Sequence, residues 1–140
     1  MAANTDPIFS NASQIGIAQI AAANTGADLS TNAALIFTGS TNGSLLIEAR
    51  IKYLPGTSTV ATAARLYINN NGTLSTTTNN SLITEITVAA ITTTQTAATA
   101  DYVFVLPRAG LFVPTNYRVY VTIGTYSTGT FMCTGIGGNY

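Results

Sequence analysis

The sequence has very few of the side chains on which most enzyme chemistry depends. Of 140 residues, 5 are Lys or Arg, 5 are Asp or Glu, and histidine is absent. Acid–base and nucleophilic catalysis need titratable groups placed near one another, and this chain has few to place. Ser-His-Asp and Cys-His arrangements are excluded because both need an imidazole. The composition therefore predicts a protein that is not an enzyme and has no catalytic residues.

The scarcity of cysteine and the lack of histidine also remove the usual metal sites. The only cysteine, Cys133, has no partner for an intrachain disulfide, and zinc and copper lose their common ligands. No GxGxxG or GxxxxGK[ST] phosphate loop occurs in the sequence. We therefore expect no metal and no cofactor, and we expect Cys133 to be a buried, inert thiol.

The sequence offers only weak support for carbohydrate chemistry. Glu48 and Glu85 lie on predicted strands, so they are either a catalytic carboxylate pair or surface charges in ion pairs. Their arginine and polar neighbours favour the second reading. Tryptophan, the best stacking platform for a sugar, is absent. The tyrosines that remain as candidate platforms are expected to pack in the core or between subunits: Tyr67, Tyr117, Tyr120 and Tyr126.

Net charge and hydropathy limit the kinds of partner. The formal net charge is zero, which argues against a basic footprint for nucleic acid or an anionic membrane. No apolar run approaches the roughly 20 residues that span a bilayer. The opening residues 1–6 lack the features of a signal peptide, so we expect folding in a cytoplasm. With little charge to keep copies apart, we expect a homo-oligomer.

Alternation of apolar and polar residues is the clearest structural signal. It is typical of half-buried strands, separated here by Asn-, Gly- and Pro-rich turns. In the strand from Ser44 to Leu54, the predicted apolar face is Leu45, Ile47, Ala49, Ile51 and Tyr53, and the other face is Glu48, Arg50 and Lys52. The pattern predicts strands at 15–20, 35–38, 44–54, 62–69, 82–90, 102–106, 116–124 and 130–136.

These about eight strands predict an all-β fold, an antiparallel two-sheet sandwich that is jelly-roll-like. An immunoglobulin-like sandwich is the main rival, and alanines at 15–23 leave a helix there as an alternative. We expect an N-terminal arm at 1–12 and a single sandwich domain at 13–140. The glycine-rich residues 135–138 are interpreted as a flexible or tightly turning terminus. The threonine- and alanine-rich segment 87–100 is a strand end with a loop, or a small-residue surface against a neighbour.

Several pieces of the chain, in matching order and spacing, resemble small virion structural proteins of tailed bacteriophages. They are Asp6-Pro7-Ile8-Phe9, Asn42-Gly43-Ser44, Gly56-Thr57, the run 61–70 (ATAARLYINN), Glu85, Leu106-Pro107, the run 117–124 (YRVYVTIG) and Gly137-Gly138-Asn139-Tyr140. The resemblance implies a β-sandwich subunit on the phage particle, a capsid decoration or cement protein, and such subunits commonly act as trimers. Its partners are then the major capsid protein or another virion protein, and its location is the virion.

A cement protein stabilises a shell by burying surface across capsomer seams, which needs no titratable site. We hypothesise that the N-terminal arm docks on a neighbour, and we predict the interface residues Pro7, Ile8, Phe9 and Tyr140. Two alternatives stay open from the sequence. One is a tail, neck or fibre subunit, and the other is a carbohydrate-binding module or small glycosidase.

Overall fold

The computed structural model describes residues 11–54, 58–94, 96–107 and 110–140. Within these residues the chain forms nine strands and one turn of 3-10 helix, η1 (Thr77–Asn79). None of the described residues belongs to a helix long and apolar enough to cross a membrane. The strands are β1 (Ala12–Ile20), β2 (Ala34–Thr38), β3 (Ser44–Tyr53), β4 (Thr62–Asn69), β5 (Asn80–Val88), β6 (Asp101–Val103), β7 (Leu111–Val113), β8 (Arg118–Ile123) and β9 (Phe131–Asn139).

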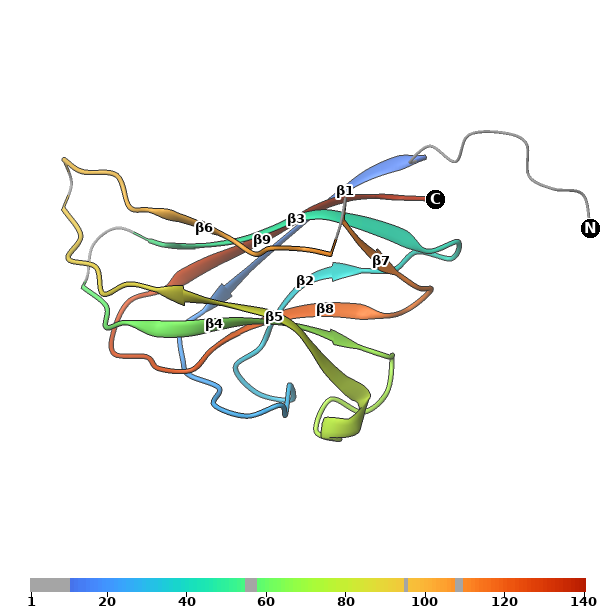
Figure 1. Ribbon diagram of the computed structural model, residues 1–140, viewed down its shortest axis with the longest axis horizontal. Coiled ribbons are helices and arrows are strands. Elements are labelled where there is room, and N and C mark those ends of the chain that lie inside the picture. Colours follow the sequence, from blue (N-terminus) through green and yellow to red (C-terminus); the bar gives the residue numbers. More distant parts are fainter. Residues whose placement is uncertain (1–10, 55–57, 95, 108–109) are drawn as a thin grey trace, which may run out of the picture.

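The strands form two antiparallel sheets packed face to face (Figure 1). Sheet A has the order β1-β9-β3-β6, with β7 also paired to β3, and sheet B has the order β2-β8-β4-β5. Most strands that follow each other in the sequence therefore lie in opposite sheets. This order is that of a jelly roll, if β6 and β7 together occupy one strand position. The predicted sandwich is confirmed, and the strand order favours the jelly roll over the immunoglobulin-like rival.

Strands β6 and β7 are two pieces of one interrupted strand beside β3. β6 pairs with residues 50–52 of β3, and β7 pairs with residues 44–46. Between them, the N–H of Phe104 still donates to the Ala49 carbonyl at 2.9 Å before the chain leaves the sheet. The strand predicted at 102–106 is thus shorter, and β7 was not predicted at all. Its three residues lie between Gly110 and Pro114, too few for a period to be recognised.

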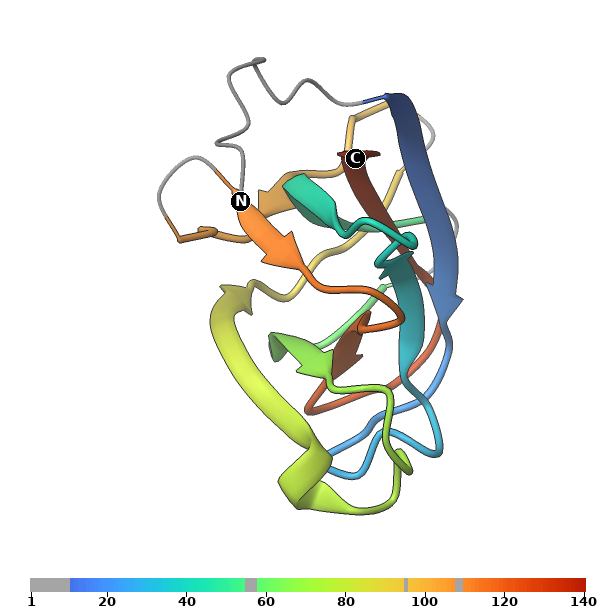
Figure 2. The same ribbon diagram turned by 90° about the vertical axis from the view of Figure 1, so that its right-hand side faces the viewer.

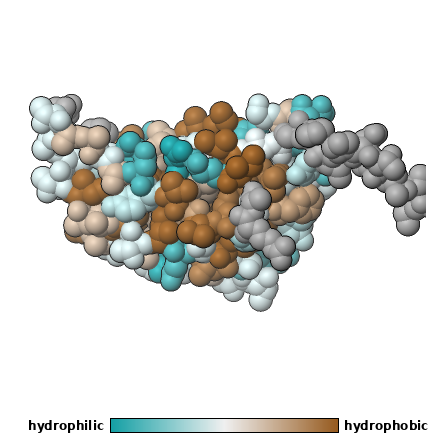
Figure 3. All heavy atoms as spheres, turned by 45° about the horizontal axis from the view of Figure 1, so that its top comes forward, coloured by the Kyte–Doolittle hydropathy of each residue, from teal (hydrophilic) through white to brown (hydrophobic). Residues whose placement is uncertain are grey.

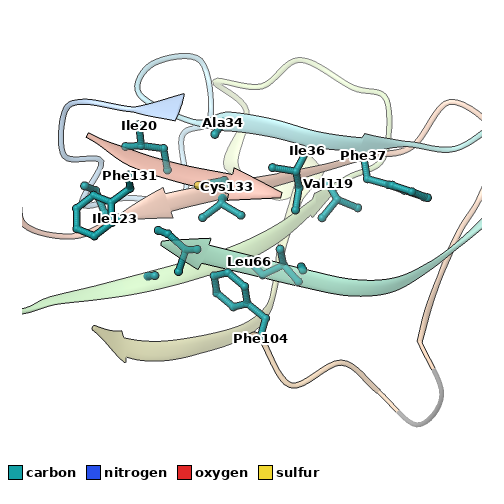
Figure 4. Packing of buried hydrophobic residues seen from close by; sticks show 14 of the residues in the cluster. Ile20, Ala34, Ile36, Phe37, Leu66, Phe104, Val119, Ile123, Phe131 and Cys133 are labelled. Atoms are coloured by element: carbon teal, nitrogen blue, oxygen red, sulfur yellow. The ribbon is translucent and has the colours of Figure 1, made fainter. Parts of the chain in front are cut away.

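The core lies between the inner faces of the two sheets (Figure 4). The rings of Tyr53 and Phe131 meet edge to face with centroids 4.9 Å apart, a geometry that adds to the free energy of burial. The Tyr53 hydroxyl donates to the Thr128 carbonyl at 2.8 Å, so its polar end is satisfied inside the protein. The other large buried side chains are Phe37, Phe104, Ile36, Leu46, Ile51, Leu66, Ile123, Val88, Val113 and Val119.

A β-bulge in β3 corrects the predicted faces of that strand. The register shifts between Leu46 and Glu48, which inserts Ile47 as an extra residue. Leu46 is therefore fully buried while Ile47 is exposed, the reverse of the predicted alternation. Beyond the bulge, Ala49, Ile51 and Tyr53 point into the core as expected. The sequence pattern missed the shift because a run of three apolar residues, 45–47, fits either register.

The glycine-rich C-terminal segment is not a turning terminus, as the sequence suggested, but part of β9 in the interior of sheet A. Gly135 and Gly137 are buried there. A Cβ on Gly135 would crowd the Ile36 backbone, and one on Gly137 would overlap the Leu45 carbonyl oxygen. These glycines let neighbouring backbone and the Phe37 ring approach β9 closely.

Strands β1 and β2 run close together at one edge of the sandwich (Figure 2). A Cβ on Gly16 of β1 would overlap the backbone carbonyl of Ile36, the residue at which β2 is bulged. The alanine-rich segment that allowed a helix at 15–23 is a strand up to Ile20. Pairing with β9 along nine residues outweighs the helix propensity of single alanines.

Part of the outer face of sheet B is covered by the loops 21–33 and 72–76. Tyr67 and Tyr120 lie opposite each other on β4 and β8, and Leu29 packs with them in a second small cluster. The Asn80 side-chain amide ties the two loops together by donating to the Ala27 and Leu74 carbonyls at 2.7 Å each. Tyr117 and Tyr126 pack against the main core. All four tyrosines therefore have the packing role that the sequence predicted.

Candidate interaction surface

The outer face of sheet A carries an unusual number of exposed apolar side chains. Its register places residues of four strand positions side by side, and the alternation of each strand decides which of them point outward. Two apolar groups result, one where β3 meets β6 and β7 and one on β1. Exposed apolar side chains gathered in one place on a soluble protein indicate an interaction site.

The first group, here called the outer cluster, lies where β3 meets β6 and β7. It consists of Leu45, Ile47, Val103, Val105 and Phe112. Val105 is 76% exposed, Ile47 58% and Phe112 55%. The bulge in β3 and the interruption between β6 and β7 lie next to each other, and together they bring these side chains outward. The area they expose is on the order of several hundred Å², the size of a functional patch on a monomer.

The second group consists of Ile15 and Ile17 on β1, which are 63% and 66% exposed. Ile15 lies beside Ile136 of β9, and Ile17 lies beside Thr134. β1 pairs with β9 and with no second strand among the residues that the structure describes. These two isoleucines therefore stand at an edge of sheet A, apart from the outer cluster.

Three charged residues, Glu48, Arg50 and Lys52, follow the outer-cluster residue Ile47 along β3, and each has an oppositely charged partner on the same face. The Arg50 Nε donates to the Glu48 carboxylate at 2.6 Å, and Lys52 Nζ lies 3.2 Å from Asp101 Oδ1. All four side chains are about one-third to one-half exposed. Ion pairs this exposed contribute little stability, but the charges of these four described side chains cancel one another.

Tyr140 lies at one end of the outer cluster, next to Phe112. Its ring stacks on Phe112 with centroids 6.4 Å apart, and its N–H donates to the Gly43 carbonyl at 3.1 Å. Gly43 has a φ of 84°, and a Cβ there would overlap the Phe112 ring. Figure 3 shows hydrophobic residues gathered in the middle of the side on which sheet A comes forward, with hydrophilic residues among them.

Of the four predicted interface residues, Tyr140 lies on this surface. Pro7, Ile8 and Phe9, with the rest of the expected arm up to residue 10, lie outside the described residues. β1 already begins at Ala12, within the segment 1–12 expected as an arm. The docking of that arm on a neighbour stays a prediction.

The carboxylates do not form a catalytic pair. Glu48 belongs to sheet A, whereas Glu85 belongs to sheet B, where it lies opposite Arg65 with Nε and Oε2 3.3 Å apart. Both glutamates are therefore in ion pairs, as their neighbours indicated. Among the described residues no three His, Cys, Asp or Glu side chains come together as metal ligands. Cys133 is fully buried, and burial raises the pKa of its thiol to about 12.

The outer cluster was not predicted from the sequence. Ile47 was assigned to the core because the alternation of apolar and polar residues along the sequence does not reveal the bulge. Phe112 lies in a strand of three residues, which is too short to recognise from the sequence. One signal was available: Val103 and Val105 flank a buried Phe104 in a run that is apolar throughout, which indicates apolar residues on both faces. No protein-family model, curated protein or solved structure matches the chain.

Proposed function

We propose that this protein is a non-enzymatic structural subunit of a phage virion, a capsid decoration or cement protein. It attaches to the major capsid protein or another virion protein through the outer cluster. The observation that carries the proposal is this group of exposed apolar side chains, beside charged side chains that are paired with one another. The resemblance to small virion proteins supplies the identity of the partner.

The chemistry of the surface suits attachment to a protein shell. Apolar side chains release free energy when a neighbour covers them, and the area of the outer cluster fits the centre of an ordinary interface. The charged residues of β3 do not oppose burial, because each of them already has a partner on the same face. A shell gains stability from such a subunit by mass action, because binding favours the assembled state.

Reconstitution on particles tests the proposal. Particles lacking the protein are mixed with purified wild type, Val103→Lys/Val105→Lys, or the control Leu82→Lys, and bound protein is measured after sedimentation. Leu82 is also an exposed apolar strand residue, but it lies on β5 of sheet B. We expect the double variant to lose at least tenfold in affinity and the control to bind like wild type. Equal binding by all three, or no binding of wild type, contradicts the proposal.

Electron cryo-microscopy of the particles then locates the subunit. Density on the capsid surface with sheet A toward the shell is the expected result. Density in the tail or neck instead identifies the tail-subunit alternative, in which copies stack head to tail.

A further inference from the structure

The edge strand β1 of sheet A supports a further inference, which depends neither on the outer cluster nor on the proposed function. Natural sheets protect exposed edges with charged side chains, prolines, or strands of only a few residues. β1 has none of these protections: it is nine residues long, and its sequence ASQIGIAQI contains neither a charged residue nor a proline. An edge of this kind is a template for pairing with another strand.

Two identical side chains, Ile15 and Ile17, flank Gly16 in β1. Beyond them the sequence is not symmetric, since the counterpart of Gln14 is Ala18. A two-fold interface requires that the same segment contacts itself, with residue i meeting residue j and j meeting i. An antiparallel pair of β1 strands centred on Gly16 meets this condition, because it places Ile15 of each copy opposite Ile17 of the other.

We propose that β1 pairs edge to edge with β1 of a second copy of this chain, antiparallel and centred on Gly16, so that sheet A continues across a two-fold axis. The exposed isoleucines then become cross-strand neighbours on the outer face, an arrangement of apolar pairs that stabilises sheets. Their register neighbours on β9, Ile136 and Thr134, lie on the side of β1 away from the second copy and continue the outer face of sheet A.

The absence of charge on β1 favours a second copy over a charged partner. Two identical strands with a charged residue near their centre would place like charges close together, whereas residues 12–20 hold none. β2 packs under β1 at Gly16 and so fixes the inner side of the strand. The paired edge is smaller than a standard interface, so the dimer forms in a concentration-dependent equilibrium. Its two-fold symmetry differs from the trimer that the resemblance implies.

Sedimentation equilibrium of the full chain measures the association. Between about 10 μM and 1 mM the mass of wild type is expected to rise from the 14.5 kDa of one chain toward twice that value. Ile17→Lys is expected to weaken association at least tenfold, whereas Leu82→Lys on β5, another edge strand, leaves it unchanged. A monomer at all concentrations, a trimer, or equal effects of the two variants overturns the proposal.

Disulfide cross-linking tests the register and does not depend on the lysine variant folding. Opposite residues in an antiparallel pair come within disulfide reach, whereas diagonal residues are about 7–8 Å apart. A mixture of Ile15→Cys and Ile17→Cys chains is therefore expected to cross-link on oxidation more than either variant alone. The native Cys133 does not compete because it is fully buried. The proposed pairing is overturned if either variant alone cross-links as much as the mixture does, or if the mixture does not cross-link.

Discussion

Gly16 of β1 faces the carbonyl oxygen of Ile36 in β2 so closely that a single added methyl group would overlap it. The two residues belong to different sheets, so this contact joins sheet A to sheet B at the edge where the sandwich closes. The bulge in β2 falls at Ile36, between the paired residues Leu35 and Phe37. The separation of the sheets at this edge therefore depends on a residue without a side chain.

Replacing Gly16 with alanine is expected to destabilise the protein by about 3 kcal/mol, because the obstacle is backbone and moves only with the sheet. The control is Gly26→Ala, where the nearest atom to an added Cβ lies at 3.9 Å. The control should change the free energy of unfolding by no more than about 0.5 kcal/mol. Denaturant unfolding of both variants measures the difference. Equal effects at the two sites would mean that the sheets separate easily at this edge.

The thiol of Cys133 should resist modification in the folded protein. Only the thiolate reacts, and burial that raises its pKa to about 12 keeps the thiol protonated at neutral pH. Labelling by a thiol reagent at pH 8 is therefore expected to proceed at the rate of unfolding, and to become rapid in denaturant. Fast labelling without denaturant would contradict the burial of this side chain.

The same shift predicts a loss of stability in alkali. Between the unfolded pKa of 9.0 and the folded pKa of about 12, the folded protein binds more protons than the unfolded chain. Stability from the neutral thiol is complete below pH 9 and falls as the pH rises above it. The difference in free energy of unfolding between wild type and Cys133→Ala should therefore shrink from pH 8 to pH 10.5. A constant difference would show that the thiol does not titrate on unfolding.

The hydroxyl of Tyr53 is expected to contribute to stability through its hydrogen bond to the Thr128 carbonyl. Tyr53→Phe keeps the ring against Phe131 but removes the donor to the Thr128 carbonyl. The expected cost is about 1 kcal/mol, measured by denaturant unfolding. Tyr140→Phe, at the half-buried C-terminal residue, is the control and should cost less than half as much.

Attachment through the outer cluster should depend weakly on salt. The charges that the structure describes on this face are already paired within it, so few of them are left to be screened when a partner binds. Particle affinity is expected to change less than about threefold between roughly 0.05 and 0.5 M salt. A steep loss of binding over this range would identify an electrostatic interface elsewhere on the molecule.

The observed bounds of the strands agree with the bounds predicted from local patterning in some places and differ in others. β4 has the predicted bounds, Thr62–Asn69, because its period-two pattern is bounded by clear turn signals on the C-terminal side. β1 and β9 extend beyond the predicted 15–20 and 130–136, since small and polar residues such as Ser13 and Gly138 take strand conformation when a neighbouring strand pairs with them. Pairing partners distant in sequence are not encoded in a local period.

The surface was harder to predict than the core. The sequence by itself determined an all-β sandwich poor in titratable groups, because period-two patterning and composition are local properties that indicate strands and count side chains. Only the tertiary structure decided which isoleucines and valines are exposed. The bulge at Ile47, the interruption between β6 and β7, and the position of β1 at a sheet edge all arise from strand pairing. Pairing joins residues far apart along the chain, so an apolar residue in the sequence does not reveal whether another strand covers it.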